Sequence, residues 1–469
     1  MMTSLADEAV ARDLSLLGLP PAAWTTPRRA TDGAPLVDVL VIGAGMCGLA
    51  AAGALALRGI RDVRLVDASP QGREGPWVTY ARMDTLRSPK TLAGPALGIP
   101  SLTFRAWYEA TFGNAAWQAL YKIPNATWQD YLGWFGRVLG LSIENDAAVA
   151  GIEPSADAVA VHRRDGRITG ARRVVLATGR AGAGGPHIPD FVDRELWPGR
   201  CAHSTEAIDF PALASRSVAV LGGSASAWDN AATALEHGAA TVDMYVRRPA
   251  LPQINKGRGS AGPGYFLGWQ ALDDDARWNL AAYMEDNPAP PPHETVNRTL
   301  RHRGFRIHLG TPVAAAARDG ERVALRLADG GRRIHDFLIL GTGFAVDLPQ
   351  RPELAAIAPA IATWADRHAP ARSRPALGRH PYLGPGFELL ERVPGMMPGL
   401  DRIHLFNHGA QLSHGMLASD IPGTSVGAAR LADAIAQAFF REDQAEIRAA
   451  LDDFDEPELA GTPFFVPRG

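Results

Sequence analysis

The fold is decided by one stretch near the start of the chain, Val37-Asp38-Val39-Leu40-Val41-Ile42-Gly43-Ala44-Gly45-Met46-Cys47-Gly48. An apolar run rich in β-branched residues ends in the pattern G-x-G-x-x-G, and an alanine-rich segment follows at once. This order predicts a strand, a tight turn and a helix. Gly43 permits the turn, Gly45 lets the backbone approach a pyrophosphate, and Gly48 allows the helix to pack closely on the strand. A diphosphate would then meet the free N–H groups of the helix N-terminus.

A second predicted strand, residues 63–67, supports the same interpretation. It ends in a carboxylate about twenty residues after the glycines, where an acidic side chain is suited to bind a ribose hydroxyl. We therefore expect a dinucleotide-binding domain in which the nucleotide is contacted by Gly43, Gly45, Met46, Gly48 and Asp67.

The composition is typical of a globular protein with more than one domain. The chain has 469 residues, 46% of them hydrophobic and 21% charged, so two or three domains are expected. The net charge of −3 argues against a nucleic-acid or polybasic membrane role. No apolar stretch is long enough to span a bilayer, and acidic residues near the start argue against a signal peptide.

Cysteine usage narrows the chemistry. The two cysteines, Cys47 and Cys201, are far apart and form no C-x-x-C pattern. This excludes the dithiol of disulfide reductases and a structural zinc cluster, and it fits a reducing cytoplasm. We expect a cytoplasmic protein without a metal centre that acts on a small molecule, and a homo-oligomer is compatible with the sequence.

The chain up to residue 210 is expected to complete the first domain. Residues 72–100 are irregular, whereas residues 102–139 have helical spacing and many aromatic side chains, for which a core position is favoured over ligand stacking. Strands are predicted at 147–152, 158–163 and 173–179. The last ends at Gly179, which either closes the nucleotide site or forms an ordinary glycine turn.

A second nucleotide unit begins at residue 217. The strand 217–221 leads into a small-residue turn and a helix, and the strand 241–246 ends in Arg247-Arg248 instead of an acid. A guanidinium there can pair with a 2′-phosphate, so NADPH is favoured over NADH. The expected contacts are Gly222, Gly223, Ser224, Ser226, Ala227, Arg247 and Arg248.

Further strands at 305–309, 323–327 and 337–344 close the second unit, with Gly343 in a second Thr-Gly turn. The pattern predicts an α/β fold with two Rossmann-like dinucleotide-binding domains, the second inserted into the first, and a mostly helical C-terminal segment. The expected division is 1–35 (helix and linker), 36–210 (first domain), 211–340 (second domain with the insertion 251–303) and 341–469 (return to the first domain).

Two such folds in series resemble the single-component class B flavoprotein monooxygenases, which bind FAD first and NADPH second. Gly75-Pro76-Trp77 is similar to the Gly-Gly-x-Trp beside the flavin in flavin-containing and Baeyer–Villiger monooxygenases. The stretch from Trp197 to His203 resembles the F-x-G-x-x-x-H pattern that precedes their NADPH fold, with Trp in place of Phe.

Other segments resemble the lysine and ornithine N-hydroxylating branch. Residues 128–134 resemble its F-x-D-Y-L-x-W helix, and Ser413-His414-Gly415-Met416 resembles its Ser/Thr-His-Gly-Leu turn at the flavin. Met83-Asp84 stands where that branch has Met-Gln. The resemblance implies that FAD is further contacted by Trp77, Met83, Asp84, Gly179, Gly343, His414, Gly415 and Met416.

The resemblance implies an NADPH-dependent monooxygenase that inserts one oxygen atom from O₂ through a C4a-(hydro)peroxyflavin, with N-hydroxylation of an amine or amino acid as the first expectation. Baeyer–Villiger oxidation and S-oxidation are the neighbouring alternatives. An electron-transfer flavoprotein reductase is the alternative of another class, although the aromatic segment and the insertion favour a closed small-molecule pocket.

Candidate substrate and catalytic residues follow from charge and position. Lys90, Arg105, Lys256 and Arg258 are possible anchors for a carboxylate-bearing substrate. Lys90, Asn407 and His414 are the catalytic candidates, with a turn-capping role for Asn407 equally open. His203 and His414 lie where they could reach nicotinamide or flavin, or serve the structure alone.

Overall fold

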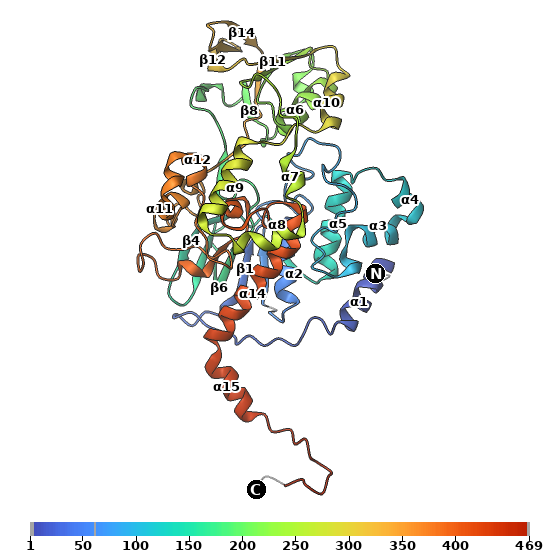
Figure 1. Ribbon diagram of the computed structural model, residues 1–469, viewed down its shortest axis with the longest axis vertical. Helices are drawn as coiled ribbons and strands as arrows, with labels where there is room; N and C mark the ends of the chain where they lie inside the picture. Colours follow the sequence, from blue (N-terminus) through green and yellow to red (C-terminus); the bar gives the residue numbers. More distant parts are fainter. Residues whose placement is uncertain (1–3, 61, 467–469) are drawn as a thin grey trace.

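Two sheets organise the computed structural model, which describes residues 4–60 and 62–466. Figure 1 shows the first sheet in the body of the molecule and the second in the upper lobe. The first has the strand order β3-β2-β1-β6-β5-β4, with β17 beside β6. Its strands are β1 (Val37–Ile42), β2 (Val63–Val66), β3 (Ser142–Glu144), β4 (Val149–Pro154), β5 (Val159–Arg163), β6 (Ile168–Leu176) and β17 (Ile403–Leu405).

The decisive stretch folds as predicted. Every residue of β1 is buried, and β1 pairs in parallel with both β2 and β6. Helix α2 (Met46–Ala56) starts directly after the glycine turn and is buried along most of its length. It packs against α14 (Thr424–Glu442) and α5 (Asn125–Val138), which explains why its sequence is apolar on all sides.

The second sheet is wholly parallel, in the order β11-β10-β9-β15-β8. Its strands are β8 (Cys201–His203), β9 (Ser217–Leu221), β10 (Thr241–Val246), β11 (Phe305–Leu309) and β15 (Phe337–Leu340), and helices α6 (Ala225–Glu236) and α10 (His293–Leu300) pack together beside it. Because β8 belongs to this sheet, the second domain starts before residue 210, the boundary expected from the sequence.

The chain crosses twice between the two sheets. The outward crossing contains β7 (Gly184–Pro186) and the return contains β16 (Phe344–Val346), and these strands pair antiparallel. A separate antiparallel sheet consists of β12 (Val313–Asp319), β13 (Arg322–Leu327) and β14 (Arg332–His335). The second domain is therefore inserted into the first, as predicted.

The aromatic segment packs between α1 (Leu5–Leu16), α3 (Phe104–Phe112), α4 (Asn114–Ala119) and α5, and it is continuous with the hydrophobic core around β1 and α2. Phe104, Trp128 and Tyr131 are fully buried and their rings are in mutual contact. The Tyr131 hydroxyl donates to the carbonyl of Leu102 at 2.7 Å. The core position expected for the aromatic residues of this segment is confirmed for most of them, but it is wrong for Phe112, which is exposed at the end of α3.

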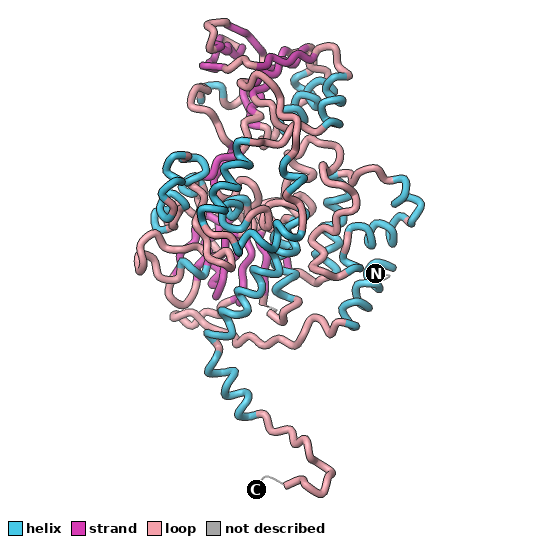
Figure 2. Tube along the Cα trace, viewed as in Figure 1, coloured by secondary structure: helices cyan, strands magenta, loops and turns pink. Residues whose placement is uncertain are grey.

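The insertion after β10 covers part of the first domain. Its helices are α7 (Lys256–Gly259), α8 (Pro263–Gly268) and α9 (Asp274–Asp286). Helix α9 lies beside α11 (Trp364–Arg367) and α12 (Pro375–Gly378) in Figure 1, and it contacts α13 (Gln411–His414). The Trp269 indole donates to the carbonyl of Leu412 at 3.3 Å, and the Tyr382 hydroxyl donates to Asp274 at 2.9 Å. Figure 2 shows these helices in front of the strands of the first sheet.

The remaining elements are short turns and one terminal helix. After α14, helix α15 (Gln444–Asp453) and the residues that follow extend away from the body (Figure 1). The described residues contain no helix that is both long and apolar enough to cross a membrane. Short 3-10 turns lie at Pro100–Leu102, Arg194–Leu196, Pro211–Leu213, Trp269–Ala271, Leu348–Gln350, Ala358–Ala360, Ala369–Ser373, Leu400–Arg402, His408–Ala410 and Ile421–Gly423.

Candidate active site

The first glycine turn forms a tight cradle. Gly43 has a φ of +102°, and a Cβ added there would lie 2.5 Å from the carbonyl oxygen of Ala177. A Cβ on Gly48 would lie only 1.8 Å from the carbonyl oxygen of Gly43. The N-cap of α2, Gly45, provides no side-chain cap, so the first N–H groups of the helix stay free for an anion.

The surroundings of this cradle suit a bound dinucleotide. Asp67 is held in place because its carboxylate accepts hydrogen bonds from the backbone N–H groups of Ala44 and Ser69, each at 2.7 Å. In two segments further along the chain, the Trp77 indole N–H and the side-chain oxygens of Asn125 and Gln129 are buried without a hydrogen-bond partner among the described residues. Buried polar atoms are rarely left unpaired, so these groups fit contacts with a bound cofactor.

The second cradle repeats the arrangement on β9 and α6. Gly222 has a φ of +126°, and a Cβ there would meet the carbonyl oxygen of Gly341 at 2.3 Å. The N-cap of α6, Ser224, makes no side-chain capping bond. At the end of β10, Arg247 and Arg248 are exposed, and neither side chain has a hydrogen bond or ion pair within residues 4–60 and 62–466. Both guanidinium groups are free to bind a phosphate.

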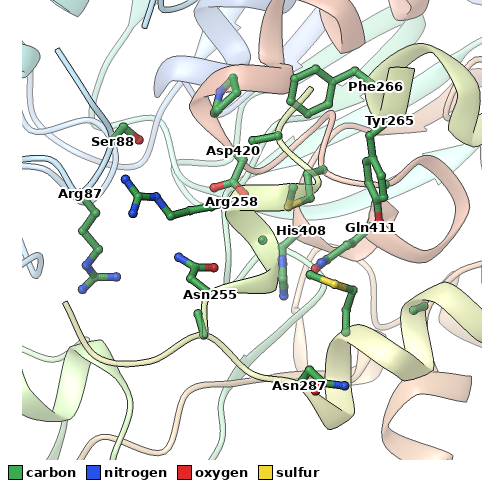
Figure 3. A pocket seen from close by; sticks show the side chains of 18 of the residues that line it. Arg87, Ser88, Asn255, Arg258, Tyr265, Phe266, Asn287, His408, Gln411 and Asp420 are labelled. Carbon is green, nitrogen blue, oxygen red and sulfur yellow. The ribbon is translucent and has the colours of Figure 1, made fainter. Parts of the chain in front are cut away.

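A cavity of about 900 Å³ lies between the insertion and the first domain. Figure 3 shows side chains that point into it. The polar and charged lining residues are Arg87, Ser88, Lys122, Asn255, Arg258, Glu285, Asn287, Glu294, His380, His408, Gln411 and Asp420. The aromatic and sulfur-containing ones are Tyr121, Tyr265, Phe266, Trp269, Met284 and Met416.

The cationic side chains that line the cavity differ in whether an acidic side chain already pairs with them. Arg87 pairs with Asp229 at 2.6 Å, and Lys122 pairs with Glu294 at 2.7 Å. The Arg258 side chain has neither an ion pair nor a hydrogen bond to any described residue, and in Figure 3 its guanidinium extends into the open space. Arg258 is therefore the cationic group that the fold leaves available to a ligand.

The two histidines of the cavity are neutral. Burial lowers the pKa of His408 to about 3 and that of His380 to about 4. The Nδ1 atom of His408 is buried without a partner among the described residues, whereas His380 Nδ1 lies 2.9 Å from the carbonyl of Leu377. His408 thus offers an uncharged imidazole with unused hydrogen-bonding capacity.

The structure does not bring the three predicted substrate anchors to the cavity wall. The Lys90 ammonium donates to the carbonyl of Trp117 at 2.7 Å, and Arg105 pairs with Glu109 on its own helix at 2.9 Å. Lys256 lies over the ring of Tyr283, and none of the three is a lining residue. Arg258 alone among the four cations considered from the sequence lines the cavity.

Two of the catalytic candidates serve the local structure. Asn407 is fully buried: its oxygen accepts from the N–H of Gly409 at 2.9 Å and its amide donates to Thr178 at 3.1 Å, which is the turn-capping role. His414 stacks on Phe387, and its two nitrogens lie 2.9 Å from the Gly384 carbonyl and 3.1 Å from the Gln270 amide. Neither side chain faces the cavity.

The other predicted contacts are placed as follows. Gly179 and Gly343 both adopt positive φ, in the turns that lead from a sheet strand into the crossing between the domains. A Cβ added at either residue would meet nothing within 4 Å. Gly415 and Met416 line the cavity. Asp84 is exposed and lies 3.7 Å from Arg298, while Met83 packs against the core. His203 is buried with its Nδ1 2.9 Å from the Thr205 hydroxyl.

Of the polar residues that line the cavity, the sequence pointed to Arg258 and missed the others, among them Asn255, His408, Gln411 and Asp420. His408 lies in the same stretch as Asn407 and His414, so the segment was recognised but the inward-facing side chain was not. Asn255 precedes Lys256, and only the start of α7 shows that Asn255 and Arg258 face inward.

A family model described as pyridine nucleotide-disulphide oxidoreductase matches residues 40–258, the span of both glycine cradles. The chain is 41% identical to the FAD-dependent urate hydroxylase of Xanthomonas campestris over 460 residues, which cover 97% of each chain. It is 25% identical to the indole-3-pyruvate monooxygenase YUCCA1 of Oryza sativa over 66% of this chain and 77% of that protein.

The chain belongs to the class B flavoprotein monooxygenases. The fold agrees: the ornithine N-hydroxylase of Kutzneria sp. 744 superposes with a TM-score of 0.68 at 18% identity, over 86% of this chain and all of that one. Members of this family are FAD- and NADPH-dependent oxidoreductases, so the predicted family, enzyme class and pair of cofactors are confirmed at this level. The two cysteines are both free, in keeping with a flavoprotein that uses no dithiol.

Proposed function

We propose that this class B flavoprotein monooxygenase hydroxylates urate or a closely related oxopurine. The observation that carries the proposal is the 41% identity to a urate hydroxylase across 97% of both chains. A similarity of that length includes both cradles and the segments that enclose the cavity.

The chemistry of the cavity supports a flat, anionic heterocycle. Urate carries one negative charge near neutral pH and presents N–H donors and carbonyl acceptors around a planar ring. Arg258 can bind a carbonyl or the anion, and the amides of Asn255 and Gln411 both donate and accept. Asp420 can accept an N–H, and the cavity volume lies in the range common for ligand pockets.

The protein's part is to bind, orient and exclude water. Bound FAD, reduced by NADPH, supplies the oxygen chemistry, in which one atom of O₂ enters the substrate and the other leaves as water. Phe266 and Trp269 are buried at the cavity wall and limit the access of water. His408 stays uncharged, so it orients the ring by hydrogen bonding without competing with Arg258 for the negative charge.

The membership of the family favours oxygen insertion over the electron-transfer reductase considered from the sequence. N-hydroxylation of an amine or amino acid stays a prediction, as do Baeyer–Villiger oxidation and S-oxidation. The structural similarity to N-hydroxylases, at 15–20% identity, concerns the fold alone. Cytoplasmic location and oligomeric state also stay predictions.

A substrate panel tests the proposal. We expect urate to stimulate NADPH oxidation by the FAD-loaded protein and to be consumed in equal amount, with L-ornithine, L-lysine and a cyclic ketone inactive. Formation of a hydroxylated amine or amino acid, with urate unchanged, would replace the proposed substrate class by the predicted N-hydroxylation.

Arg258→Leu is expected to raise the KM for urate about 10- to 100-fold, because a charge-assisted hydrogen bond contributes roughly 1.5–3 kcal/mol. Lys256→Leu is the matched control: it removes the neighbouring positive charge, which does not line the cavity. Steady-state kinetics with varied urate measure both. An equal rise of the KM for urate in the two variants would show a general effect of positive charge and would mean that Arg258 does not bind the substrate.

Replacing both Arg247 and Arg248 by glutamine is expected to lower kcat/KM for NADPH about 10- to 100-fold and to leave NADH nearly unaffected, because the lost contacts are charge-assisted bonds to the 2′-phosphate. The control replaces Arg301 and Arg303, two other exposed arginines of the second domain. The ratio of the two coenzymes' kcat/KM values is the readout, and an unchanged ratio would assign the phosphate to other residues.

A further inference from the structure

The chain continues past the body of the enzyme in a segment that touches little else. Residues 444–466, here called the C-terminal arm, consist of α15 and an extended tail, and α15 buries none of its residues. Figure 1 shows the arm leaving the body at the end of α14 and pointing away from it.

The arm carries an apolar stripe whose outer part faces solvent, while Ile447 at its base is half-buried. At 100° per residue, Ile447, Leu451 and Phe454 fall on one side of the helix. Leu451 is 68% exposed and Phe454 64%, and in the tail Phe464 is 77% exposed. Exposed apolar side chains gathered on one side of a helix are typical of an interface.

The base of the arm is rigidly fixed. Asp443, the residue before α15, is fully buried, and its carboxylate binds Arg172 at 2.7 Å and Arg28 at 2.9 Å. Arg28 also reaches Glu446 in the first turn of α15, at 2.6 Å. A buried ion cluster therefore sets the direction in which the arm leaves the body.

The charge of the arm indicates what it binds. Residues 444–466 contain six acidic residues and one arginine, a net charge of −5, whereas the whole chain carries −3. The rest of the chain is therefore positive, at +2, of which Arg468 beyond the arm contributes one charge and residues 1–443 the other. An arm of this charge is attracted to the body of a second copy and repelled by anionic membranes or nucleic acid.

The size of the arm also suits a second copy. Its 23 residues equal the roughly 20–30 residues that each side contributes to a standard stable interface. In a two-fold dimer the contact occurs twice, once for each arm.

We propose that the C-terminal arm docks its Ile447–Leu451–Phe454 stripe on a second copy of this chain and so forms a homodimer. The dimer is independent of the substrate proposed above, because the arm lies away from the cavity.

Sedimentation velocity on the full-length FAD-loaded protein tests this. We expect the wild-type protein to be a dimer at micromolar concentration. The double substitution Leu451→Glu with Phe454→Glu is expected to raise the dissociation constant of the dimer about 100-fold or more. The effect is large because apolar anchors near an interface centre dominate the affinity, and each side chain occurs twice in the dimer. The matched control, Ala445→Glu with Ala449→Glu, adds the same charge on the opposite face of α15 and is expected to leave the dimer intact.

The thermal midpoint and NADPH oxidation rate of each variant show that it remains folded, because these side chains are exposed. A wild-type protein that sediments as a monomer would overturn the proposal. This holds also for a monomer whose arm resists proteolysis because it packs on its own body. A dimer that survives both stripe substitutions would overturn it equally.

Discussion

Replacing Gly48 by alanine is expected to abolish stable FAD binding and to destabilise the protein by about 3 kcal/mol, near the upper end for added core volume. The new Cβ would lie 1.8 Å from the carbonyl oxygen of Gly43, which is backbone and cannot rotate away. Helix α2 must then move off β1, and its N-terminus no longer meets the diphosphate. Flavin content after purification and the denaturation midpoint measure the two effects.

Gly133→Ala is the matched control for that substitution. Gly133 lies within α5, and a Cβ there would meet nothing within 4 Å. We expect Gly133→Ala to keep the full flavin content and to raise the free energy of unfolding by roughly 0.5–1 kcal/mol, the usual benefit of alanine over glycine in a helix. Full flavin occupancy in the Gly48→Ala variant would mean that α2 does not hold the cofactor as described.

Arg172→Met is expected to lower the free energy of unfolding by about 3–5 kcal/mol, the cost of removing one partner from a buried ion cluster. The Arg172 guanidinium is 2% exposed and binds Asp443 at 2.7 Å, Glu442 at 3.1 Å and Asp38 at 3.5 Å. It also lies over the ring of Phe439, 4.1 Å from its centroid. Without it, buried Asp443 keeps only Arg28 as a cationic partner among the described residues.

The same cluster predicts the direction of the pH dependence. Burial on its own would raise the pKa of Asp443, but the hydrogen bonds from Arg172, Thr26 and Arg28 outweigh it, and the pKa is lowered. The stabilisation is therefore present above the unfolded-state pKa and is lost as pH falls through the lower folded-state pKa. Chemical denaturation should therefore show that Arg172→Met lowers the free energy of unfolding at neutral pH, and that it lowers it by less in strong acid.

Arg167→Met is the control for the ion cluster, because Arg167 is 61% exposed and pairs with Glu144 and Asp165 at the surface. We expect Arg167→Met to lower the free energy of unfolding by at most about 1 kcal/mol. Equal losses in the two variants would contradict the importance of burial for the Arg172 cluster.

The sequence was sufficient for the two nucleotide folds because their signals are local. The strands β9 and β10 have the predicted bounds, and Gly43, Gly48 and Gly222 have close backbone contacts that leave no room for a side chain. The Arg247–Arg248 pair directly follows β10 and is exposed, as its position in the sequence implies, and its contact with a 2′-phosphate stays a prediction.

The cavity could not be predicted in the same way, because its wall comes from segments far apart in the chain. Arg87, Arg258 and His408 converge only after the insertion packs on the first domain. A short motif indicates that a segment lies near the flavin, yet it does not show which side chain turns inward: Asn407 caps a turn while its neighbour His408 faces the cavity. The arm was not predicted because Leu451 and Phe454 are exposed, so no packing partner within the described residues marks them as important.

Incorporation of oxygen from isotopically labelled O₂ is the most direct test of the central claim, that this family member inserts one oxygen atom into an oxopurine. We expect the FAD-loaded protein, given NADPH and urate, to form a product with one labelled oxygen atom and to consume one NADPH for each product molecule. NADPH oxidation that yields only hydrogen peroxide, or a product whose new oxygen comes from water, would contradict it.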